Sequence, residues 1–542
     1  MQPSINPVAL TIFLGLFVLV TVVGFFAARW RRADLNHLNE WGLGGRSFGT
    51  IVTWFLLGGD LYTAYTFIAV PGLVFLAGAP GFFAVPYTII AFPIVFLVFP
   101  RLWAVAKKHN YITAADFVAG RFESKWLGLA VAFTGILATM PYIALQLVGI
   151  QVVLVALGLQ GQGIWADLPL VIAFVILAAY TYTSGLRAPA LIAVVKDLLV
   201  YIAVIAIIIV IPIHLGGFGE IFKHVPLAKQ TLAPGGINQF WTLALGSALA
   251  LFLYPHAITG IFSSKGGNIV KRNAAFLTAY SFLLGLLALV GFMGIAAGIT
   301  INAHANGIAI SGGKYSVQSG NFMMPALILQ QFPGWFQGVA FAAIAIGALV
   351  PAAVMSIAAS NLFTRNIYTA FFRAGATPAE ETRVAKIVSL LVKFGALVFI
   401  LFIPTQNALN FQLLGGVWIL QTLPPVIIGL YTRFMHRWAL LIGWAVGMVA
   451  GTWMVISASA GGLGLVSAFT IKMNGTPLLL FGKYTATFYA GFLAVILNLV
   501  VAFVFSLIFN AMHLPNGKDA TSATDYEASA VDAAPVSALA EE

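Results

Sequence analysis

Two acidic side chains stand inside long apolar stretches of this 542-residue sequence. Of its 16 Asp and Glu residues, only Asp60 and Asp197 fall well within such runs. A charge at the centre of a membrane is unfavourable by several kcal/mol unless it faces a partner or a water-filled cavity. Lys196 directly precedes Asp197, so those two side chains could pair with each other or reach the membrane surface. We interpret Asp60 as a cation-binding group, with a structural ion pair to a neighbouring helix as the alternative.

The residues around Asp60 predict a break in the helix that carries it. Gly58 and Gly59 precede Asp60, and glycine in a helix interior costs about 1 kcal/mol. A break at membrane depth leaves backbone groups that are tolerated only where they line protein or a cavity. Free carbonyls beside a carboxylate suit a hard cation such as sodium, whereas unpaired N–H groups at a half-helix near Thr63 suit an anion. Hydroxyl side chains after the break could add to that anion site, at Tyr62, Thr63, Tyr65 and Thr66.

A second interruption is predicted at Pro255, in the apolar run at 240–262. Proline removes a helix hydrogen bond there and leaves the Leu251 carbonyl unpaired. This run lies five predicted spans after the run at 49–77, as expected when two five-helix units repeat with inverted topology. His256 could accept a proton or bind a substrate, or it could pack against a backbone carbonyl.

The composition places these helices in a lipid bilayer. Hydrophobic residues make up 61% of the chain and charged residues 8%, against about 25% charged in a soluble domain. Thirteen apolar runs have the length of a spanning helix, and they predict an all-α polytopic membrane protein. The absence of cysteine excludes disulfides and thiol catalysis. No phosphate loop, metal-ligand spacing or catalytic serine elbow is visible, so neither an enzyme, an organic cofactor nor a nucleic-acid partner is predicted.

The distribution of basic residues predicts the orientation. With the N-terminus outside, 20 of the 27 Lys and Arg residues fall on the inner side and five on the outer side, with Lys196 and Lys393 in or near spans. Thirteen spans then place the C-terminus in the cytoplasm. We expect a transmembrane domain over residues 1–515, with its core at about 49–431, and a disordered acidic tail over residues 516–542.

Five short segments stand in a characteristic order: Gly42-Leu43-Gly44-Gly45-Arg46-Ser47, Gly59 to Thr66, Ser184-Gly185-Leu186, Pro255-His256 and Leu362-Phe363-Thr364-Arg365-Asn366-Ile367-Tyr368. Taken together they resemble the sodium:solute symporter family, over about residues 42–450. The resemblance implies ten core helices in a five-plus-five inverted repeat, with one extra helix before them and two after, in a bacterial inner membrane. Within the family, the Tyr254-Pro255-His256 segment is similar to that of the acetate and monocarboxylate permeases.

The same resemblance implies a sodium site at the first helix break. Its carbonyl ligands would fall at Gly58, Leu61 and Gly347, with Asp60 as an assisting acid. The pair of hydroxyl ligands expected on the eighth core helix falls at Val350 and Pro351, which offer none. The nearest hydroxyl on that helix, Ser356, is more than one turn further on. Proton coupling through Asp60, with His256 as a second group, therefore competes with sodium coupling.

The predicted function is cation-coupled import of small monocarboxylates, such as acetate, propionate, pyruvate or lactate, by alternating access. The hydroxyls of Tyr62, Thr63, Tyr65, Thr66 and Tyr254 could hold a carboxylate, and His256, Gln412 and Trp418 could complete or close the cavity, with core packing as the alternative for Trp418. No arginine lies clearly at mid-depth, which disfavours a dicarboxylate. A passive channel or facilitator is the alternative, and a transporter-like sensor would need a signalling domain. The sequence does not predict an oligomeric state.

Overall fold

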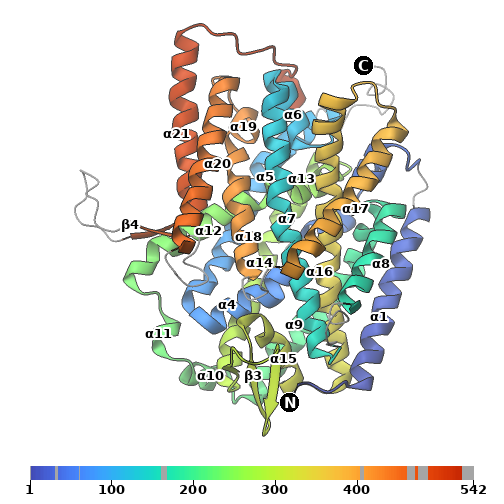
Figure 1. Ribbon diagram of the computed structural model, residues 1–542, viewed down its shortest axis with the longest axis vertical. Coiled ribbons are helices and arrows are strands. Elements are labelled where there is room, and N and C mark those ends of the chain that lie inside the picture. The colour runs from blue at the N-terminus through green and yellow to red at the C-terminus, as the bar shows by residue number, and fades with distance from the viewer. Residues whose placement is uncertain are drawn as a thin grey trace.

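The computed structural model describes residues 2–30, 34–59, 62–159, 168–402, 408–460, 470–473 and 486–527. It confirms the all-α fold class, because helices account for almost all regular structure in these ranges. The start of α1 and the segment at residues 516–527 lie at opposite ends of a tall helical bundle (Figure 1). Short strands add a three-stranded sheet, in the order β1-β3-β2, and a β4–β5 pair, neither of which the sequence predicted.

The α-helices and strands have the following bounds: α1 Pro7–Phe26, α2 Leu38–Leu43, α3 Thr50–Gly59, α4 Val70–Ala77, α5 Ala84–Lys108, α6 Ala114–Phe122, α7 Lys125–Ala156, α8 Leu168–Ser184, α9 Arg187–His214, α10 Phe218–His224, α11 Leu227–Gln230, α12 Ile237–Leu251, α13 Pro255–Phe262, α14 Gly267–Ala296, β1 Thr300–Ile301, β2 Ile308–Ser311, β3 Lys314–Val317, α15 Met323–Gln331, α16 Gly334–Phe363, α17 Pro378–Phe402, α18 Ala408–Ile419, α19 Leu423–Val426, α20 Arg437–Ala460, β4 Thr470–Met473, β5 Ala486–Tyr489 and α21 Ala490–Ala511. Two segments are π-helical, η3 at Tyr65–Ala69 and η8 at Thr364–Phe372. A short 3-10 helix, η13, lies at Ala523–Tyr526.

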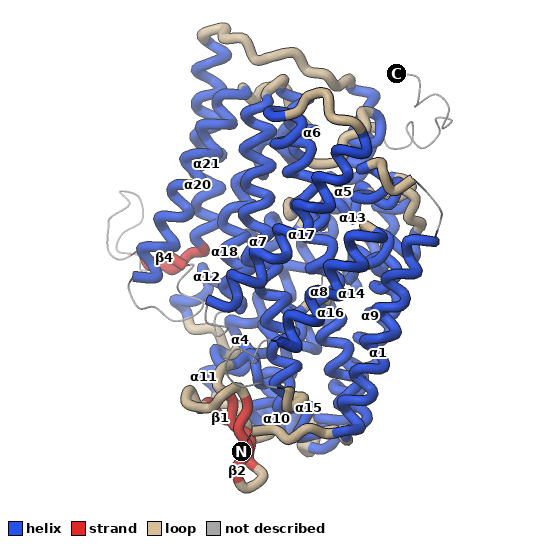
Figure 2. The backbone as a smooth tube through the Cα atoms, turned by 45° about the vertical axis from the view of Figure 1, so that its right-hand side comes forward, coloured by secondary structure: helices blue, strands red, loops and turns tan. Residues whose placement is uncertain are grey.

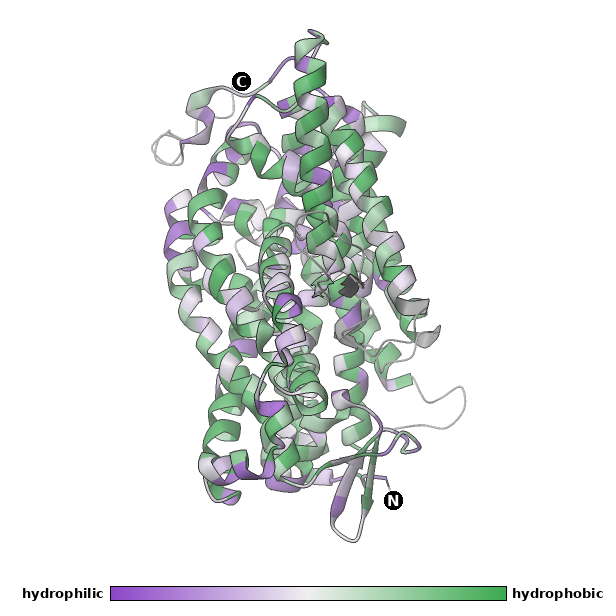
Figure 3. Cartoon of the chain, turned by 90° about the vertical axis from the view of Figure 1, so that its left-hand side faces the viewer, coloured by the Kyte–Doolittle hydropathy of each residue, from purple (hydrophilic) through white to green (hydrophobic). Residues whose placement is uncertain are grey.

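The outer helices expose apolar side chains, as a lipid-facing surface requires. Leu97, Phe282 and Trp453 are 66%, 70% and 69% exposed. Hydrophobic colour covers most of the long helices, whereas hydrophilic residues gather at helix ends and loops (Figure 3). Within the described ranges, nine helices are long and apolar enough to span a membrane, or ten with the bent pair. The predicted number of thirteen spans stays a prediction.

Two helices, α7 and α16, form the centre of the bundle. The apolar segment of α16 is almost completely buried, and this helix packs against α1, α7, α9 and α17. Small residues make this close packing possible, because the sequence of α16 from Ala340 to Ala353 is rich in alanine and contains one glycine. Figure 2 shows the same arrangement of long, steeply inclined helices from a second direction.

Both predicted helix breaks are present. The α3 helix ends at Gly59, and the π-helical turn η3 begins at Tyr65 before the chain continues into α4. Likewise, α12 ends at Leu251 and α13 begins at Pro255, with a bend of 46° across the break. The proline occupies the first turn of α13, where its missing N–H leaves no helix hydrogen bond unmade.

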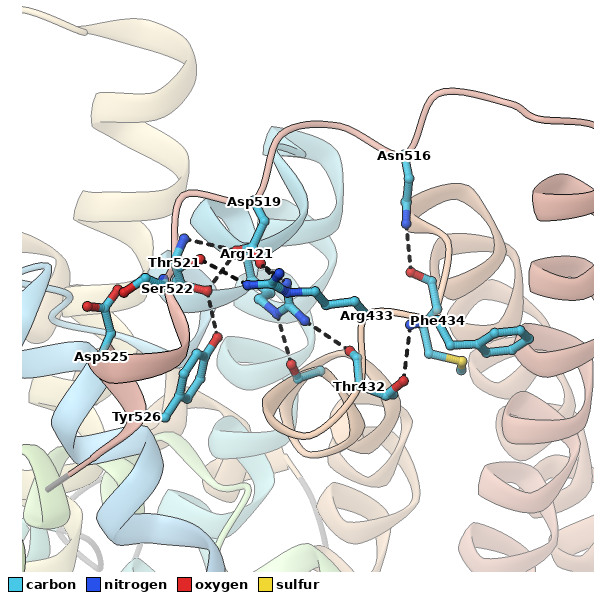
Figure 4. A network of polar contacts seen from close by, with 12 residues as sticks. Arg121, Thr432, Arg433, Phe434, Asn516, Asp519, Thr521, Ser522, Asp525 and Tyr526 are labelled. Atoms are coloured by element: carbon cyan, nitrogen blue, oxygen red, sulfur yellow. Dashed lines mark hydrogen bonds and ion pairs between the residues drawn. The ribbon is translucent and has the colours of Figure 1, made fainter.

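Residues 516–527 differ from the disordered tail that the sequence predicted. Asp519 pairs with the buried Arg121 on α6, and its Oδ2 lies 3.2 Å from Nε of Arg433 (Figure 4). At the start of this segment, the Asn516 side chain donates a 3.0 Å hydrogen bond to the Met435 carbonyl. Composition alone suggested an unpacked acidic segment, but its acids meet basic side chains at this end of the bundle. The rest of the predicted tail, residues 528–542, lies outside the described residues.

Candidate functional site

A buried lysine lies in the break between α3 and η3. Lys196 on α9 donates a 2.7 Å hydrogen bond to the Gly59 carbonyl and a 3.2 Å hydrogen bond to the Tyr62 carbonyl. Its side chain is fully buried. A Cβ at Gly59 would lie 2.8 Å from Nζ of Lys196, so only glycine admits the ammonium at this distance. The carbonyl groups freed by the break therefore face a positive charge that the chain itself supplies.

The Lys196 ammonium belongs to a closed polar network. Its Nζ lies 2.9 Å from Oδ1 of Asp197, which is equally buried. The second oxygen of Asp197 accepts a 3.0 Å hydrogen bond from the Tyr280 hydroxyl on α14. The Tyr62 hydroxyl in turn donates a 2.7 Å hydrogen bond to the Tyr280 carbonyl, and the two rings meet edge-on at 4.4 Å. The network joins the break to α9 and α14. Lys196 and Asp197 therefore pair, as the sequence allowed, and do not reach the membrane surface.

The face of α16 next to this break is apolar. A Cβ at Gly347 would lie 3.7 Å from the Tyr62 carbonyl oxygen, which places this helix beside the second lysine contact. Val350 and Pro351 follow on α16 and are buried, without a hydroxyl between them. Ser356 uses its own hydroxyl to donate to the Ala353 carbonyl at 2.8 Å. Of the predicted cation ligands, the structure brings Gly347 to the break.

Two predicted cation ligands lie outside the described residues, namely Asp60 and Leu61. The Gly58 carbonyl accepts a 3.3 Å hydrogen bond from the Tyr62 N–H, so it continues the local backbone pattern. Elsewhere in the described chain, no group of three or more His, Asp or Glu side chains could hold a metal ion. Among the described residues, the Lys196 ammonium donates to the carbonyls of Gly59 and Tyr62, which flank these two undescribed positions, so the predicted cation ligands Asp60 and Leu61 stay predictions.

A cluster of buried tyrosines lies where the two broken helices approach each other. Tyr142 on α7 lies 5.2 Å from Tyr254 by ring centroids, and Tyr65 on η3 lies 6.1 Å from Tyr87 on α5. The two pairs adjoin, because η3 packs against α7 and α18, and the Tyr489 side chain contacts α18 as well. We call Tyr65, Tyr87, Tyr142, Tyr254 and Tyr489 the tyrosine cluster.

Two members of the tyrosine cluster are held by backbone carbonyls of α18. The Tyr254 hydroxyl donates a 3.0 Å hydrogen bond to the Gln412 carbonyl, and the Tyr489 hydroxyl donates a 2.8 Å hydrogen bond to the Leu413 carbonyl. A glycine on α18 makes the approach possible, because a Cβ at Gly415 would lie 2.5 Å from the Tyr254 hydroxyl. The cluster therefore combines fixed aromatic walls with a small number of polar groups.

Unpartnered polar atoms mark the same region. His256 is fully buried and neither of its ring nitrogens has a hydrogen-bond partner among the described residues. Its ring lies 5.4 Å from Tyr142 and 5.3 Å from Tyr254. The side-chain oxygen Oε1 of Gln412, on α18, is also buried and has no hydrogen-bond partner among the described residues. A buried polar atom without a partner is unfavourable, so these atoms are candidates for contact with a bound polar molecule.

A separate small cavity lies between α6, α7, α13, α16 and the segment from the end of α18 to α19, and none of the tyrosine cluster, His256 or Gln412 lines it. Its wall is mainly apolar, with three threonine hydroxyls, and Pro255 of the second break contributes to it. The lining residues are Ile112, Thr113, Ala114, Val131, Gly135, Leu253, Pro255, Ile258, Thr259, Ala358, Leu362, Ile419, Thr422 and Val426.

One prediction about the first half-helix is wrong: the N–H groups at its start are not free. The Thr63 N–H bonds the Thr66 hydroxyl at 3.3 Å, and the Tyr65 N–H bonds the Thr63 hydroxyl at 3.1 Å. The Ala64 N–H bonds Oε1 of Gln146 on α7 at 3.2 Å. Side-chain capping thus satisfies the donors that an anion was expected to use. Thr63 and Thr66 serve as caps, and any anion here would compete with Gln146.

The structure brings four of the predicted substrate residues together, namely Tyr65, Tyr254, His256 and Gln412. Tyr62 joins the lysine network instead. Trp418 donates its indole N–H to Thr452 on α20 at 3.0 Å, which agrees with the packing alternative. Sequence reasoning missed Tyr87, Tyr142, Gln146, Tyr489 and the role of Lys196. Of these, only Lys196 could have been noticed in the sequence, because a Lys-Asp pair inside an apolar run is unusual. The three tyrosines and the glutamine stand in apolar runs without a distinguishing pattern.

Comparison with known proteins agrees with this architecture. Residues 41–451 match the model of the sodium:solute symporter family. The chain is 52% identical over 519 residues to a monocarboxylate transport permease protein of Rhizobium johnstonii, covering 94% of this chain and 99% of that protein. It is 34% identical to the uncharacterized symporter YodF of Bacillus subtilis, covering 84% and 90% of the two chains.

A solved structure gives the same fold at low sequence identity. A Na+-coupled sialic acid symporter, in a substrate-bound outward-open state, superposes with a TM-score of 0.72 at 16% identity, covering 93% of this chain and 98% of that one. The match confirms the expected all-α fold. With a family model matched over most of its length and broken helices where that architecture requires them, the chain belongs to the sodium:solute symporter family.

Proposed function

We propose that this protein is a cation-coupled symporter that imports small monocarboxylates across a bacterial inner membrane. The observation that carries the proposal is the buried, uncharged polar cluster between the two broken helices, formed by the tyrosine cluster with His256 and Gln412. The 52% identical relative is named as a monocarboxylate transport permease. A substrate with one carboxylate and two to four carbons fits a site with few polar groups and much apolar wall.

The charge of the site limits the substrate. A carboxylate that enters a low-dielectric site needs a positive partner, because an isolated buried charge is strongly unfavourable. The tyrosine cluster contains no cationic side chain among the described residues, so the co-transported cation would balance one negative charge. A dicarboxylate would leave a second charge uncompensated. Hydroxyl donors of tyrosine and an imidazole suit a carboxylate, a keto group or a hydroxyl group.

Competition for uptake tests the substrate class. The purified full-length chain is reconstituted into vesicles, and entry of labelled pyruvate and labelled acetate is measured against unlabelled competitors. We expect acetate, propionate, pyruvate and lactate to inhibit, and succinate, proline and glucose to have little effect. Inhibition by proline or glucose, with no effect of the short acids, would overturn the assignment.

A further inference from the structure

The segment at residues 516–527 crosses one end of the bundle, over α5, α6 and the linker between α19 and α20 (Figure 4). The distribution of basic residues predicts that this end is cytoplasmic. The small cavity described above has part of its wall on α6 and α19. We call residues 516–527 the latch, and we propose that the latch holds this cavity closed at this end and must release before the cavity opens to solvent.

One buried arginine joins the three parts of this junction. Arg121 on α6 donates 3.0 Å hydrogen bonds from Nε to the Gly429 carbonyl and from Nη2 to the Thr432 carbonyl, both in the linker after α19. Its Nη1 atom pairs with Asp519 of the latch. Asp519 also lies 3.2 Å from Nε of Arg433. Within the described ranges, Asp519 is the only carboxylate that forms an ion pair with either arginine.

A second contact attaches the latch to α5. Oδ2 of Asp525 lies 2.8 Å from Nε2 of His109, the residue that follows α5. The ring of Tyr526 packs edge-on against Phe117 of α6, with 6.5 Å between the ring centroids, and lies 5.5 Å from the guanidinium of Arg101 on α5. The latch therefore connects α5 and α6 with the linker after α19.

The elements that the latch connects also enclose the cavity. Ala114 begins α6 and Val426 ends α19, and both line the cavity together with Thr259 of α13. Arg121 lies about 10 Å further along α6 than Ala114, at 1.5 Å per residue, and Gly429 follows closely after Val426. The contact of Arg121 with Gly429 therefore joins the same two parts of the chain. If α6 and α19 move apart, the cavity widens at this end and that contact breaks.

The carboxylate of Asp519 controls how strongly this contact holds. A buried guanidinium is unfavourable unless an opposite charge and hydrogen bonds compensate it. Arg121 has both while α6, the linker and the latch are together. Without the carboxylate, the closed junction would hold Arg121 and Arg433 near each other with no negative charge between them, and like charges repel. The bound latch therefore favours the closed cavity, and its release favours opening.

The latch can release without unfolding of the bundle. Thr521, Asp525 and Tyr526 are buried, whereas its other residues are exposed or partly exposed. Its backbone contacts α6 at Ala520, whose N–H donates a 3.1 Å hydrogen bond to the Gly120 carbonyl. A surface segment with few buried side chains opens at a lower free energy than the bundle unfolds. Opening of the latch is therefore a local event.

Cysteine labelling tests the latch without reference to any substrate. The chain contains no cysteine, so Thr259→Cys places a single thiol on the cavity wall. With the full chain in lipid vesicles, we expect N-ethylmaleimide to label this thiol slowly. Adding Asp519→Asn and Asp525→Asn should speed labelling about fivefold or more, in the range of measured coupling between sites. Glu527→Gln, at an exposed position of the latch, is the matched control and should leave the rate unchanged. Equal labelling of the two latch variants would overturn the proposal.

A second thiol separates opening at this end from a general loss of stability. Thr88 is buried near the start of α5, whereas the latch contacts His109 just after the end of that helix. We expect Thr88→Cys to be labelled at the same rate with and without the two latch substitutions. A similar rise at both thiols would show that the whole bundle has loosened, and would overturn the proposal.

Fixing the latch in place tests its consequence for transport, which rests on the proposed function. His109→Cys and Asp525→Cys, joined by a short bifunctional maleimide, attach the latch covalently to the end of α5. We expect the cross-linked chain to lose entry of labelled pyruvate into vesicles, and the same double variant without the reagent to keep it. Undiminished entry after complete cross-linking would overturn the latch. Absence of entry in the wild-type chain would instead overturn the proposed function, and the labelling test would still decide the latch.

Discussion

At the scale of single residues, we expect transport to require glycine at position 59, where the Lys196 side chain approaches the backbone closely. A Cβ in the variant Gly59→Ala would lie 2.8 Å from Nζ, so the end of the Lys196 side chain would have to shift from its present position between the carbonyls. We expect uptake of labelled pyruvate into vesicles, driven by an inward cation gradient, to fall about tenfold or more. The control is Gly285→Ala on α14, where the nearest side-chain atom would be an ordinary 3.8 Å away. Equal activity of the two variants would contradict the assigned site.

His256 offers a test that separates function from stability. Both ring nitrogens are buried without partners, so the change His256→Phe removes no hydrogen bond between described residues. We expect an unchanged or slightly higher melting temperature, together with a KM for pyruvate raised about fivefold, the effect of one hydrogen bond of about 1 kcal/mol. A lower melting temperature with an unchanged KM would show that the imidazole is structural.

The residues also show where sequence reasoning succeeded. Two glycines and a proline predicted both helix breaks, because these residue types act on the backbone within one turn. The capping of Thr63, Ala64 and Tyr65 by side chains was not predictable, since it depends partly on Gln146 from a distant helix. Likewise, the sequence showed that Lys196 could pair with Asp197, whereas its contact with the break depends on how α9 packs against α3.

At the scale of elements, the segment at residues 516–527 should stabilise the end of the bundle to which it binds. Arg121 is 7% exposed and pairs with Asp519, so Asp519→Asn leaves a buried guanidinium without its charge partner. We expect a loss of about 1–2 kcal/mol in the free energy of unfolding and faster proteolysis after Asn516. Glu527→Gln, at an exposed position of the same segment, should change neither. Equal proteolysis of the two variants would contradict the assigned contact.

The same segment should remain bound at neutral pH. Burial raises the pKa of Asp525, but hydrogen bonds from Ser522 and His109 outweigh it, and the pKa lies below the ordinary value of 3.8. A carboxylate with a lowered pKa stabilises the bound state above its ordinary pKa and loses that effect as the pH falls through the lowered value. Proteolysis of the segment should therefore change little between pH 8 and about pH 5 and increase below about pH 4. An increase already at pH 6 would contradict this.

Three glycines on α20 indicate its close packing against neighbouring helices. Gly443, Gly447 and Gly451 form a stripe of small residues, which predicts a close helix contact within the bundle. A Cβ at Gly443 would lie 2.7 Å from Oδ1 of Asn498 on α21, and one at Gly451 would lie 2.8 Å from Val417 on α18. The three glycines therefore permit close helix contacts inside this chain.

At the scale of the whole molecule, composition and apolar runs predicted the fold class, and the order of short segments predicted the family. Neither could predict which side chains gather at the centre, because Tyr87, Tyr142 and Tyr489 come from three distant parts of the chain. The site depends on the way α5, α7 and α18 surround the two broken helices. Hydropathy describes the surface that faces lipid and carries little information about the interior.

The central claim is that the protein drives a small monocarboxylate uphill. The most direct measurement is the steady-state ratio of labelled pyruvate inside and outside vesicles that contain the full chain, with a cation gradient directed inward. The account predicts a ratio well above one that collapses to one when an ionophore dissipates the gradient. A ratio of one at every gradient, reached faster than in vesicles without protein, would show a passive facilitator and contradict the account.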